Sequence, residues 1–337
     1  MILIISEKDD NSAKKIINLC KTNSIPYFEI FNEDKIIIDD IEIINGVLKN
    51  FSFYNERNRK KIWKNSIKSF FYRQGLITPN INLKFKKNVN DIIRNELTTA
   101  LIDEFNSIIF YIFDYIESNV KCIGNYNNNI PNKLVMLRIA SMCGLKTPNT
   151  YIYTDFTKRN INYKEYITKS IQDIIGIVYE NNIYFSYTAL PKKSIIENNY
   201  FSNYPSLIQK RIKKQFEIRS FFFADKIFSV AILNSEKTDY RENNITDIIP
   251  YTFNKIYLEK ILKFIDNCGF NSGSMDFIVD ENDEIFFLEI NPHGQFDFIS
   301  DYCGNNIEIE IFNYLTRNWY ENFDENITTE INTAFIY

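Results

Sequence analysis

The sequence predicts a mixed α/β (α+β) protein whose first lobe contains parallel strands and whose last lobe is mostly antiparallel. An apolar strand at Met1–Ser6, a helical pattern at Ser12–Thr22 and a strand at Tyr27–Phe31 give the order β-α-β, which is typical of a parallel sheet. In the last lobe, three β-rich segments follow one another with short connections, which favours antiparallel pairing. These segments are 207–212, 216–223 and 227–233, and further short strands are expected in the first lobe at 36–38, 42–44 and 66–73.

Helices and a small sheet separate the two ends of the chain. Asp91–Asn119 alternates apolar and polar residues with helical spacing and is the longest expected helix in the first third of the chain. Asn132–Cys143 is a second amphipathic helix, which Gly144 closes and Pro148 follows, the usual order of helix stop signals. Strands are expected at 161–169, 176–179 and 182–187, and a helix at 258–268. We therefore expect three lobes, at 1–122, 123–206 and 207–337.

Composition fits a globular protein of more than one lobe. The chain has 337 residues, more than one ordinary core holds, with 45% hydrophobic and 24% charged residues. A net charge of -4 gives no global electrostatic reason to expect nucleic acid. The five cysteines lack C-x-x-C spacing, which indicates reduced thiols, and the apolar runs are too short to span a membrane. We expect a cytoplasmic protein that binds neither nucleic acid nor a membrane.

The most informative segment is a predicted β-hairpin in the last lobe. Two apolar, β-rich stretches flank the turn-forming residues 281–284. A two-residue turn at Asn282 and Asp283 would place Asp276 directly opposite Glu289 on the neighbouring strand. The sequence therefore predicts that these two carboxylates lie side by side.

This hairpin would gather hard oxygen ligands on one face. Asn291 follows Glu289 by two residues and therefore shares its face. One alternative is that Asp276 and Glu289 are ordinary solvated residues, but Glu289 interrupts a run of Phe and Leu, where an unpaired carboxylate would be costly to bury. Carboxylate and amide oxygens without a His or Cys pair suit Mg²⁺, which shares its ligand sphere with substrate phosphates. The trio therefore predicts a metal site for a metal-bound nucleotide.

The polar residues between Lys133 and Gln295, taken in chain order, resemble those of the ATP-grasp ligases, in which two antiparallel sheets hold ATP between them. Their order and spacing together carry the resemblance. It implies an ATP-grasp fold with an N-terminal pre-grasp α/β lobe, a small central lobe and a C-terminal, mostly antiparallel lobe. The residues concerned are Lys133, Lys169, Gln209, Lys210, Arg211, Ile212, Glu217, Arg219, Arg241, Asp276, Glu289 and Asn291.

The role that the resemblance implies for each residue suits its chemistry. Lysine ammonium groups form charge-assisted bonds with phosphates, so Lys133 and Lys169 are expected at the nucleotide phosphates. Arg219 and Arg241 are expected to clamp the γ-phosphoryl group or the acyl phosphate, because a guanidinium stabilises spread negative charge. Glu217 is expected at the ribose hydroxyls. The adenine is expected at the backbone of a hinge segment formed by Gln209, Lys210, Arg211 and Ile212.

Further motifs look like those of the graspetide synthetases, and most of all like the "grasp-with-spasm" peptide maturases. Such enzymes activate Asp or Glu side chains of a ribosomal precursor peptide and close ω-ester or ω-amide rings with its Ser, Thr or Lys side chains. The resemblance implies ATP and Mg²⁺ as cofactors, a precursor peptide with a leader and an acidic core as partner, and Arg73 and Gln295 as peptide contacts. The motifs are Tyr72-Arg73-Gln74-Gly75, Ile123-Gly124-Asn125 and Asn291-Pro292-His293-Gly294-Gln295.

Several alternatives stay open. A ligase of the same fold that adds a free amino acid to a peptide or protein would share every ATP-binding residue. A non-catalytic nucleotide- or peptide-binding protein is a third interpretation, although a degenerate site usually loses ligands first. The basic runs at 57–61 and 210–214 are either solvated faces or a track for an acidic peptide. The oligomeric state is open, with a homodimer as one option, and the single histidine, His293, is expected to line the mouth of the site.

Overall fold

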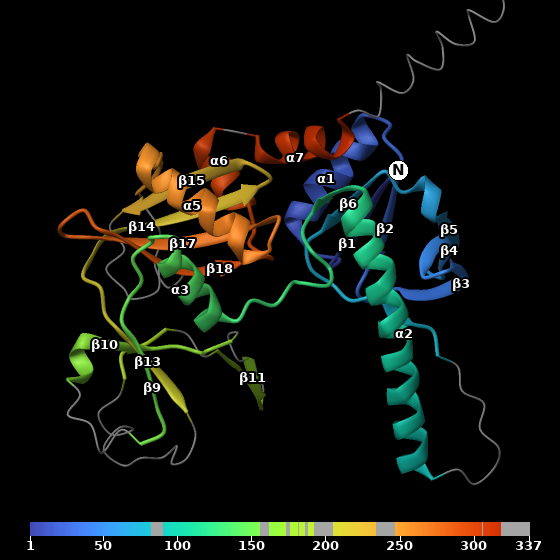
Figure 1. Cartoon of the computed structure of the whole chain (residues 1–337), viewed down its shortest axis with the longest axis horizontal. Coiled ribbons are helices and arrows are strands. Elements are labelled where there is room, and N and C mark those ends of the chain that lie inside the picture. Colours follow the sequence, from blue (N-terminus) through green and yellow to red (C-terminus); the bar gives the residue numbers. More distant parts are fainter. Residues whose placement is uncertain are drawn as a thin grey trace, which may run out of the picture. The chain divides into compact units, whose positions relative to one another are not determined.

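The computed structural model describes residues 1–81, 90–155, 162–172, 176–180, 182–185, 188–191, 205–233, 247–304 and 306–317. The chain divides into two compact units, the first formed by Met1–Asn129 with Asn306–Tyr337 and the second by Ile130–Asn305. Figure 1 shows the elements of both units coloured along the sequence. The expected division into three lobes stays a prediction. No helix in the described ranges is long and apolar enough to cross a membrane.

The first unit contains the predicted parallel sheet. Helix α1 (Asn11–Thr22) connects its first two strands, and Asp10 caps the helix by accepting a hydrogen bond from the amide of Ala13 at 2.6 Å. Every pairing in this sheet is parallel, which confirms the β-α-β start. The strands lie in the order β2 (Tyr27–Phe31), β1 (Ile2–Ser6), β6 (Ser69–Tyr72) and β8 (Lys121–Ile123).

A second sheet of the first unit corrects the sequence-based prediction. The segments 36–38 and 42–44 belong to one strand, β3 (Lys35–Ile44), which runs on through a bulge between Ile38 and Asp40. Its partner β4 (Val47–Asn55) and the edge strand β5 (Lys60–Trp63) were not predicted. Strand β7 (Thr78–Pro79) pairs with β3 on the other side, and η1 (Lys64–Ser66) follows β5.

Two helices complete this unit. Helix α2 (Asp91–Asn119) has the predicted bounds, and its second half buries Ile112 and Phe113 in the core, where Phe113 packs against Phe70 with ring centroids 5.1 Å apart. Helix α7 (Ile307–Thr316), which the sequence did not predict, packs against α1 and β8. Apolar side chains from the two sheets and from α2 therefore form one core in this unit.

The second unit begins with α3 (Lys133–Met142), and an antiparallel three-stranded sheet follows. Its strands lie in the order β10 (Tyr166–Thr168), β13 (Ser206–Lys210) and β9 (Thr150–Tyr153), with η2 (Tyr163–Glu165) before β10. Strands β11 (Gly176–Tyr179) and β12 (Asn182–Phe185) form a separate antiparallel hairpin. The predicted small sheet is therefore wrong in its pairing: β10 pairs with β13, from a segment expected in the last lobe, and β11 and β12 form a hairpin of their own.

A five-stranded antiparallel sheet forms the rest of the second unit, and the predicted strands at 216–223 and 227–233 belong to it, whereas the one at 207–212 does not. Helices α3 and α5 (Lys255–Cys268) bury one face of this sheet, where Met275, Phe277 and Phe287 are fully buried. Helix α6 (Asp297–Cys303) packs against β15 and β16. The opposite face carries Arg219, Asp276 and Glu289, and it also buries Phe221 and Phe223, of which Phe221 packs against Phe296 just before α6. The strands lie in the order β16 (Asp247–Pro250), β15 (Lys226–Leu233), β14 (Lys214–Phe223), β17 (Ser272–Asp280) and β18 (Ile285–Asn291).

Candidate active site

The β17–β18 hairpin places the predicted oxygen ligands together. Asp276 pairs with Glu289, as the sequence predicted, and Ser274 pairs with Asn291. Because paired residues of an antiparallel ladder point to the same face, and residues two apart share a face, the side chains of Asp276, Glu289 and Asn291 lie on one side of the sheet. The strand pairing behind the expected metal site is therefore confirmed.

The predicted turn that connects these strands is wrong. Three residues, 281–283, form the loop instead of two: the amide of Asp283 donates to the carbonyl oxygen of Asp280 at 3.1 Å, and the amide of Asp280 donates to the carbonyl oxygen of Glu284 at 3.0 Å. Asp283 has φ of 60°, the left-handed conformation typical of the last residue in such a loop. The Asp280 side chain also accepts from the amides of Asn282 and Glu284, which holds the loop in place.

A β-bulge corrects the register that this longer loop shifts. Phe277 pairs with Phe287 and Asp276 pairs with Glu289, so Leu288 is an extra residue on β18. Phe287 is therefore fully buried on the core face while Glu289, two residues later, lies on the opposite face. Without the extra residue, Phe287 and Glu289 would share a face. The bulge therefore allows Phe287 to enter the core while Glu289 faces away from it.

Two lysines from different elements meet Glu289. Lys133 is the first residue of α3, and the Asn132 side chain caps that helix by accepting from two backbone amides at 3.1 Å. Lys169 directly follows β10 of the three-stranded sheet. Their Nζ atoms lie 3.4 and 3.6 Å from Glu289 Oε2. The three-stranded and five-stranded sheets of the second unit therefore approach each other at this carboxylate.

The three charges perturb one another. Burial is the main cause that lowers the pKa of Lys169, and repulsion from Lys133 adds to it, while attraction to Glu289 opposes both. Burial alone would raise the pKa of Glu289, but the nearby ammonium groups, first Lys169 and then Lys133, bring it below its usual value. Glu289 is therefore ionised at neutral pH between two cations.

Asp276 has a cationic partner of its own. Arg219 on β14 is its register partner across the sheet, and Arg219 Nη1 lies 2.8 Å from Asp276 Oδ1 and 2.7 Å from Oδ2. The neighbouring register pair, Ile218 with Phe277, is buried in the core and fixes which face Arg219 takes. Both carboxylates of the predicted metal site therefore face protein cations that a bound metal and nucleotide would have to rearrange.

The loop after β18 is fitted closely to β17. Asn291 Oδ1 accepts from the amide of His293 at 2.9 Å, and the Asn291 carbonyl oxygen accepts from the amide of Gly294 at 2.9 Å. A Cβ atom on Gly294 would lie 1.8 Å from Ser274 Oγ, so only glycine allows this approach. His293 is half-buried and Gln295 is exposed. The Asn-Pro-x-Gly-Gln pattern therefore reflects a tight turn that holds the Asn291 side chain at the end of the trio.

The hinge expected at the adenine joins β13 to β14. Gln209 is 1% exposed, and its Nε2 donates to Thr150 Oγ1 at 2.9 Å. The backbone amides of Lys210 and Arg211 already donate to carbonyl oxygens of neighbouring segments, each at 2.8 Å. Within the described ranges, the backbone amide of Ile212 donates to no backbone carbonyl. Of the hinge amides beyond Gln209, that of Ile212 is therefore the one open to a ligand.

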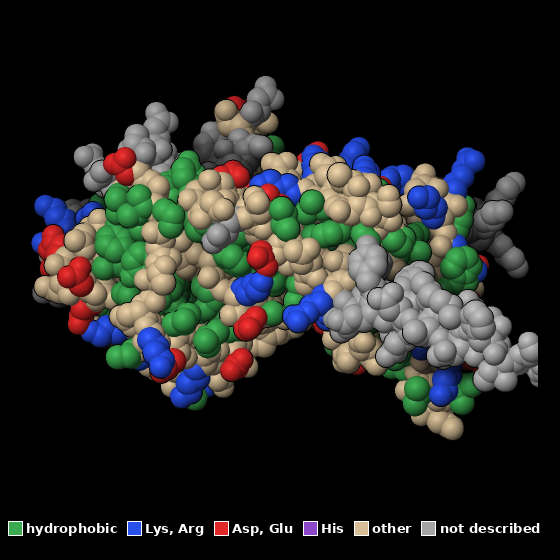
Figure 2. Space-filling view, turned by 90° about the horizontal axis from the view of Figure 1, so that it is seen from above, with side chains coloured by type: hydrophobic (Ala, Val, Ile, Leu, Met, Phe, Trp, Pro, Cys, Tyr) green, Lys and Arg blue, Asp and Glu red, His purple; other side chains and the backbone are tan. Residues whose placement is uncertain are grey.

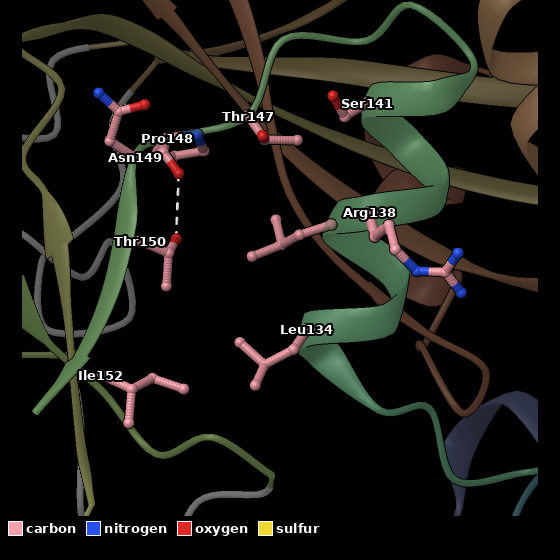
Figure 3. Close-up of a pocket in the computed structure, with 9 residues that line it drawn as sticks. Leu134, Arg138, Ser141, Thr147, Pro148, Asn149, Thr150 and Ile152 are labelled. Carbon is pink, nitrogen blue, oxygen red and sulfur yellow. Dashed lines mark hydrogen bonds between the residues drawn. The ribbon is translucent and has the colours of Figure 1, made fainter.

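A cavity of about 320 Å³ lies beside this hinge, between α3 and the start of β9. Figure 3 shows the side chains of Leu134 from α3 and Ile152 from β9 on its two sides, with the Thr150 hydroxyl donating to the Pro148 carbonyl oxygen. The Arg138 side chain points away from the cavity in the same view. The lining combines apolar side chains such as Leu134 and Ile152 with the polar residues Thr147, Asn149 and Thr150, of which Thr150 contacts Gln209.

The second basic run is neutralised by neighbouring carboxylates. Lys213 pairs with Glu281 at 3.9 Å, and Lys214 pairs with Glu217 at 2.5 Å. Glu217, the expected ribose ligand, therefore has a lysine partner on its own strand. Lys210 forms an ion pair with Glu165.

The first basic run is neutralised in the same way. Arg57 pairs with Asp34 and with Glu29, and Lys61 pairs with Asp39. Figure 2 shows Lys and Arg interspersed with Asp and Glu on the face that it presents, rather than a surface of one sign. Arg57 and Lys61 of the first run and Lys210, Lys213 and Lys214 of the second are therefore paired with carboxylates, and the two interpretations of the runs both stay predictions.

Two further site residues, Arg73 and Arg241, were predicted from the sequence motifs. Arg73 belongs to the first unit, where it is 3% exposed and its Nη2 lies 3.4 Å from Asp10 Oδ2. The backbone amide of Arg73 donates to Ile5, so the residue is part of the end of the parallel sheet. Arg241 lies outside the described residues. The roles assigned to both stay predictions.

Sequence reasoning missed the partners of the site residues. Nothing in the spacing of Lys133 and Glu289 shows that they meet, because the contact depends on how α3 packs beside β18. Ser274 and Thr150 were also missed as neighbours of Gly294 and Gln209. For Thr150 a signal was present, since it lies at the end of the Pro148-Asn149-Thr150 segment that follows the helix.

Several solved structures share the fold of this chain. The macrocyclase MdnC from Microcystis aeruginosa MRC, bound with precursor peptide MdnA, has 20% identity and a TM-score of 0.72, and the match covers 94% of this chain and 99% of that chain. A RiPP-associated ATP-grasp ligase from Chryseobacterium gregarium, in complex with ADP and a leader and core peptide, has 20% identity and a TM-score of 0.75, over 93% and 96% of the two chains. The ATP-grasp ligase PsnB, complexed with a phosphomimetic variant of its minimal precursor, Mg and ADP, has 12% identity and a TM-score of 0.65, over 93% and 97%.

No protein-family model and no curated protein matches the sequence. The structural matches nevertheless span nearly the whole of this chain and of the chains that it resembles, so both units take part in the likeness. At identities of 12 to 20%, the matches establish the fold of this chain, and its chemistry has to be argued from the residues of the site. The chain has the ATP-grasp fold of peptide macrocyclases and RiPP-associated ligases, as its sequence motifs predicted.

Proposed function

We propose that this protein is an ATP-dependent peptide maturase. It activates Asp or Glu side chains of a ribosomal precursor peptide as acyl phosphates and closes ω-ester or ω-amide rings with Ser, Thr or Lys side chains. The observation that carries the proposal is the meeting of Lys133, Lys169 and Glu289 beside the Arg219–Asp276 pair. The peptide substrate is supported by the likeness to macrocyclase and ligase structures that contain precursor peptides.

The oxygen donors of the hairpin fit Mg²⁺. Asp276, Glu289 and Asn291 offer two carboxylates and one amide oxygen on a single face, a hard donor set that needs further ligands from phosphate oxygens. These three side chains would hold the ion, which when bound neutralises charge on the nucleotide phosphates. Among the described residues, no group of three His, Cys, Asp or Glu side chains is placed to hold a metal, and the proposed set instead combines two carboxylates with one amide.

The cations of the site suit the nucleotide. Lys133 and Lys169 would exchange part of their contact with Glu289 for phosphate oxygens, since their Nζ atoms are already gathered within 3.6 Å of one point. The Ile212 amide would serve the adenine and Glu217 the ribose. Lys210 and Arg211 would contribute to the hinge through their carbonyl oxygens, because their amides are already used.

The proposed chemistry has two steps. A peptide carboxylate attacks the γ-phosphorus of ATP, which releases ADP and gives an acyl phosphate. A peptide hydroxyl or amine then attacks the acyl carbon, loses its proton and expels phosphate, so that the peptide loses one water for each ring. Arg219 and Arg241 would stabilise the negative charge on the phosphoryl group, and holding both peptide groups together makes the ring closure intramolecular. Arg73 and Gln295 would position the peptide.

Intact-peptide mass spectrometry tests this function. Incubated with its precursor, ATP and Mg²⁺, the protein should lower the peptide mass by one or more water units. Mild base should reopen the rings if the links are esters and leave them closed if they are amides. A mass gain that matches an added amino acid would favour the alternative ligase, and no ATP-dependent change of mass would favour a non-catalytic binding protein. A cytoplasmic location and a homodimer stay predictions.

A further inference from the structure

The N-terminal half of helix α2 lies outside the core of its own unit. Figure 1 shows this half extending beyond the sheets of the first unit. Every residue from 91 to 104 is exposed except Thr98, which is half-buried, whereas Ile109 and Ile112 further along the helix are buried in the core. Most of the stability of a helix in a protein comes from the packing of an apolar face. The described part of the first unit therefore gives residues 91–104 little of that packing.

This half nevertheless carries an apolar stripe, formed by Ile93, Leu97, Leu101 and Phe105. The four residues follow one another at intervals of four, so their side chains form one row along the helix. Ile93, Leu97 and Leu101 are 51, 46 and 40% exposed, and Phe105 is half-buried against the core. Ile109, the next residue of the same row, is 1% exposed. The row that enters the core at one end therefore continues into solvent at the other.

The charges of this half fit a second, antiparallel copy of the same helix. Arg94 is the only basic residue of α2. In an antiparallel pair centred on Thr99, positions equally far from the centre lie at the same height, so Arg94 lies beside the partner's Glu104 and Leu97 beside the partner's Leu101. In this register no acidic residue of the exposed half lies at the height of another. The acidic residues concerned are Asp91, Glu96, Asp103 and Glu104.

A parallel pair is disfavoured by the same charges. In register, it would place Arg94 beside the partner's Arg94 and every acidic residue beside its own copy, and like charges side by side destabilise an interface. The antiparallel pair also brings Ile93 to the height of the partner's Phe105, so the apolar stripe covers itself. The stripe and the charges are therefore complementary to the same surface turned end over end, which is the property of a two-fold, isologous contact.

We propose that two copies of this chain associate through the N-terminal halves of their α2 helices, which pair antiparallel about Thr99. Each stripe then removes apolar side chains of the other from water. The overlapping segment, 91–107, is about 25 Å long. A contact of this length lies at the small end of specific interfaces, so we expect a reversible dimer with a Kd on the order of 10 µM. None of these residues belongs to the nucleotide or metal site, so the inference goes beyond the proposed function and does not depend on it.

Sedimentation equilibrium of the full chain, without nucleotide or peptide, tests the association. The wild-type protein should change from monomer to dimer as its concentration rises from about 1 to about 100 µM. Leu97→Asp should raise the Kd about 100-fold, because two-fold symmetry places the new carboxylate in an apolar contact twice. Ile92→Asp is the matched control. Ile92 is 63% exposed in the same half of the helix but lies about 140° from Leu97 around the helix axis, so its replacement should leave the Kd unchanged.

Charge reversal tests the antiparallel register. Arg94→Glu should weaken the dimer about tenfold, and Glu104→Arg added to the same chain should restore it, because antiparallel pairing joins these two positions. Failure of the second substitution to restore the dimer would overturn the register.

A wild-type protein that stays monomeric at about 100 µM would overturn the association. A dimer that Leu97→Asp leaves intact would overturn the assigned surface. Loss of precursor-peptide binding in Leu97→Asp, with a monomeric wild-type protein, would mean that the stripe binds peptide instead. ATP affinity should be the same in all these variants, so none of these results bears on the proposed function. The wild-type concentration series needs no variant, so a variant that fails to fold does not remove the test.

Discussion

Replacing Glu289 with Gln removes one charge from the centre of the site and should change both stability and metal dependence. Glu289 Oε2 lies 3.4 Å from Lys133 Nζ and 3.6 Å from Lys169 Nζ. At an effective dielectric constant of about 20, each contact is worth about 5 kcal/mol of attraction before desolvation and ordering are subtracted. The three side chains are 12 to 28% exposed, so these costs are substantial. We expect a net loss of about 2 kcal/mol in the free energy of unfolding for Glu289→Gln, between the values for exposed and fully buried pairs.

The same substitution should reverse the preference between free and metal-bound ATP. Without the carboxylate, the two ammonium groups repel each other and are open to phosphate, so ATP in the presence of EDTA should bind about tenfold more tightly than it does to the wild-type protein. Binding of the magnesium complex should weaken, because one hard ligand is lost. Titration calorimetry with and without Mg²⁺ measures both effects, and urea denaturation measures the stability.

A matched control lies on the same hairpin. Glu281 pairs with Lys213 at 3.9 Å, with side chains 67% and 83% exposed, so Glu281→Gln should change the stability by less than about 0.5 kcal/mol and leave nucleotide binding unaltered. The reasoning fails if Glu289→Gln melts like the wild-type protein and binds metal-free ATP with unchanged affinity. In that case the lysine contacts would carry no net energy.

Further predictions concern the rest of the site. Gly294→Ala should lower the free energy of unfolding by about 2 kcal/mol, because its Cβ would lie 1.8 Å from Ser274 Oγ. In a denaturation experiment, Ser274→Gly in the same chain should restore part of this loss, since the contact of 2.7 Å with the backbone nitrogen of residue 274 would remain. Arg219→Met should lower the free energy of unfolding by about 2 kcal/mol, because it leaves Asp276 without its two short contacts. A double-mutant cycle with Asp276→Asn should show a coupling energy of about 1 kcal/mol, and strictly additive effects of the two substitutions would contradict the pairing. Asp276→Ala and Asn291→Ala should each abolish peptide-dependent ADP release while the protein stays folded, and near-normal turnover in both would remove the metal assignment.

Local sequence patterns were sufficient where a structure depends on neighbouring residues. The helix at Asp91–Asn119 and the strand at Tyr27–Phe31 have the predicted bounds, because apolar periodicity and helix-capping signals act within one turn or one pleat. The strand β3 was divided wrongly, because a bulge carries one continuous strand past the polar pair Asp39 and Asp40. The hairpin β4–β5 was missed because its basic and aromatic residues gave no clear alternation.

The sequence predicted the pairing of Asp276 with Glu289 correctly, but it did so from a turn that the structure does not contain. A two-residue turn would have given it directly, whereas the structure reaches it through a three-residue loop and the extra residue Leu288. The two changes cancel. Register in a half-buried sheet is determined by which side chains must enter the core, so Phe277 and Phe287 enforce the pairing whatever the loop length.

The sequence by itself determined the order of the elements, the face that carries the oxygen ligands and the family that the motifs resemble, because these follow from residue types and short spacings. Only the tertiary structure decided which cations meet which carboxylates. Lys133, Lys169 and Glu289 lie on three elements far apart in the chain, and their contact within 3.6 Å exists only once the three-stranded and five-stranded sheets have been brought together. Likewise, only packing shows that Gln209 buries an oxygen without a donor. Electrostatic and hydrogen-bond partners depend on distance in space, which sequence spacing does not encode.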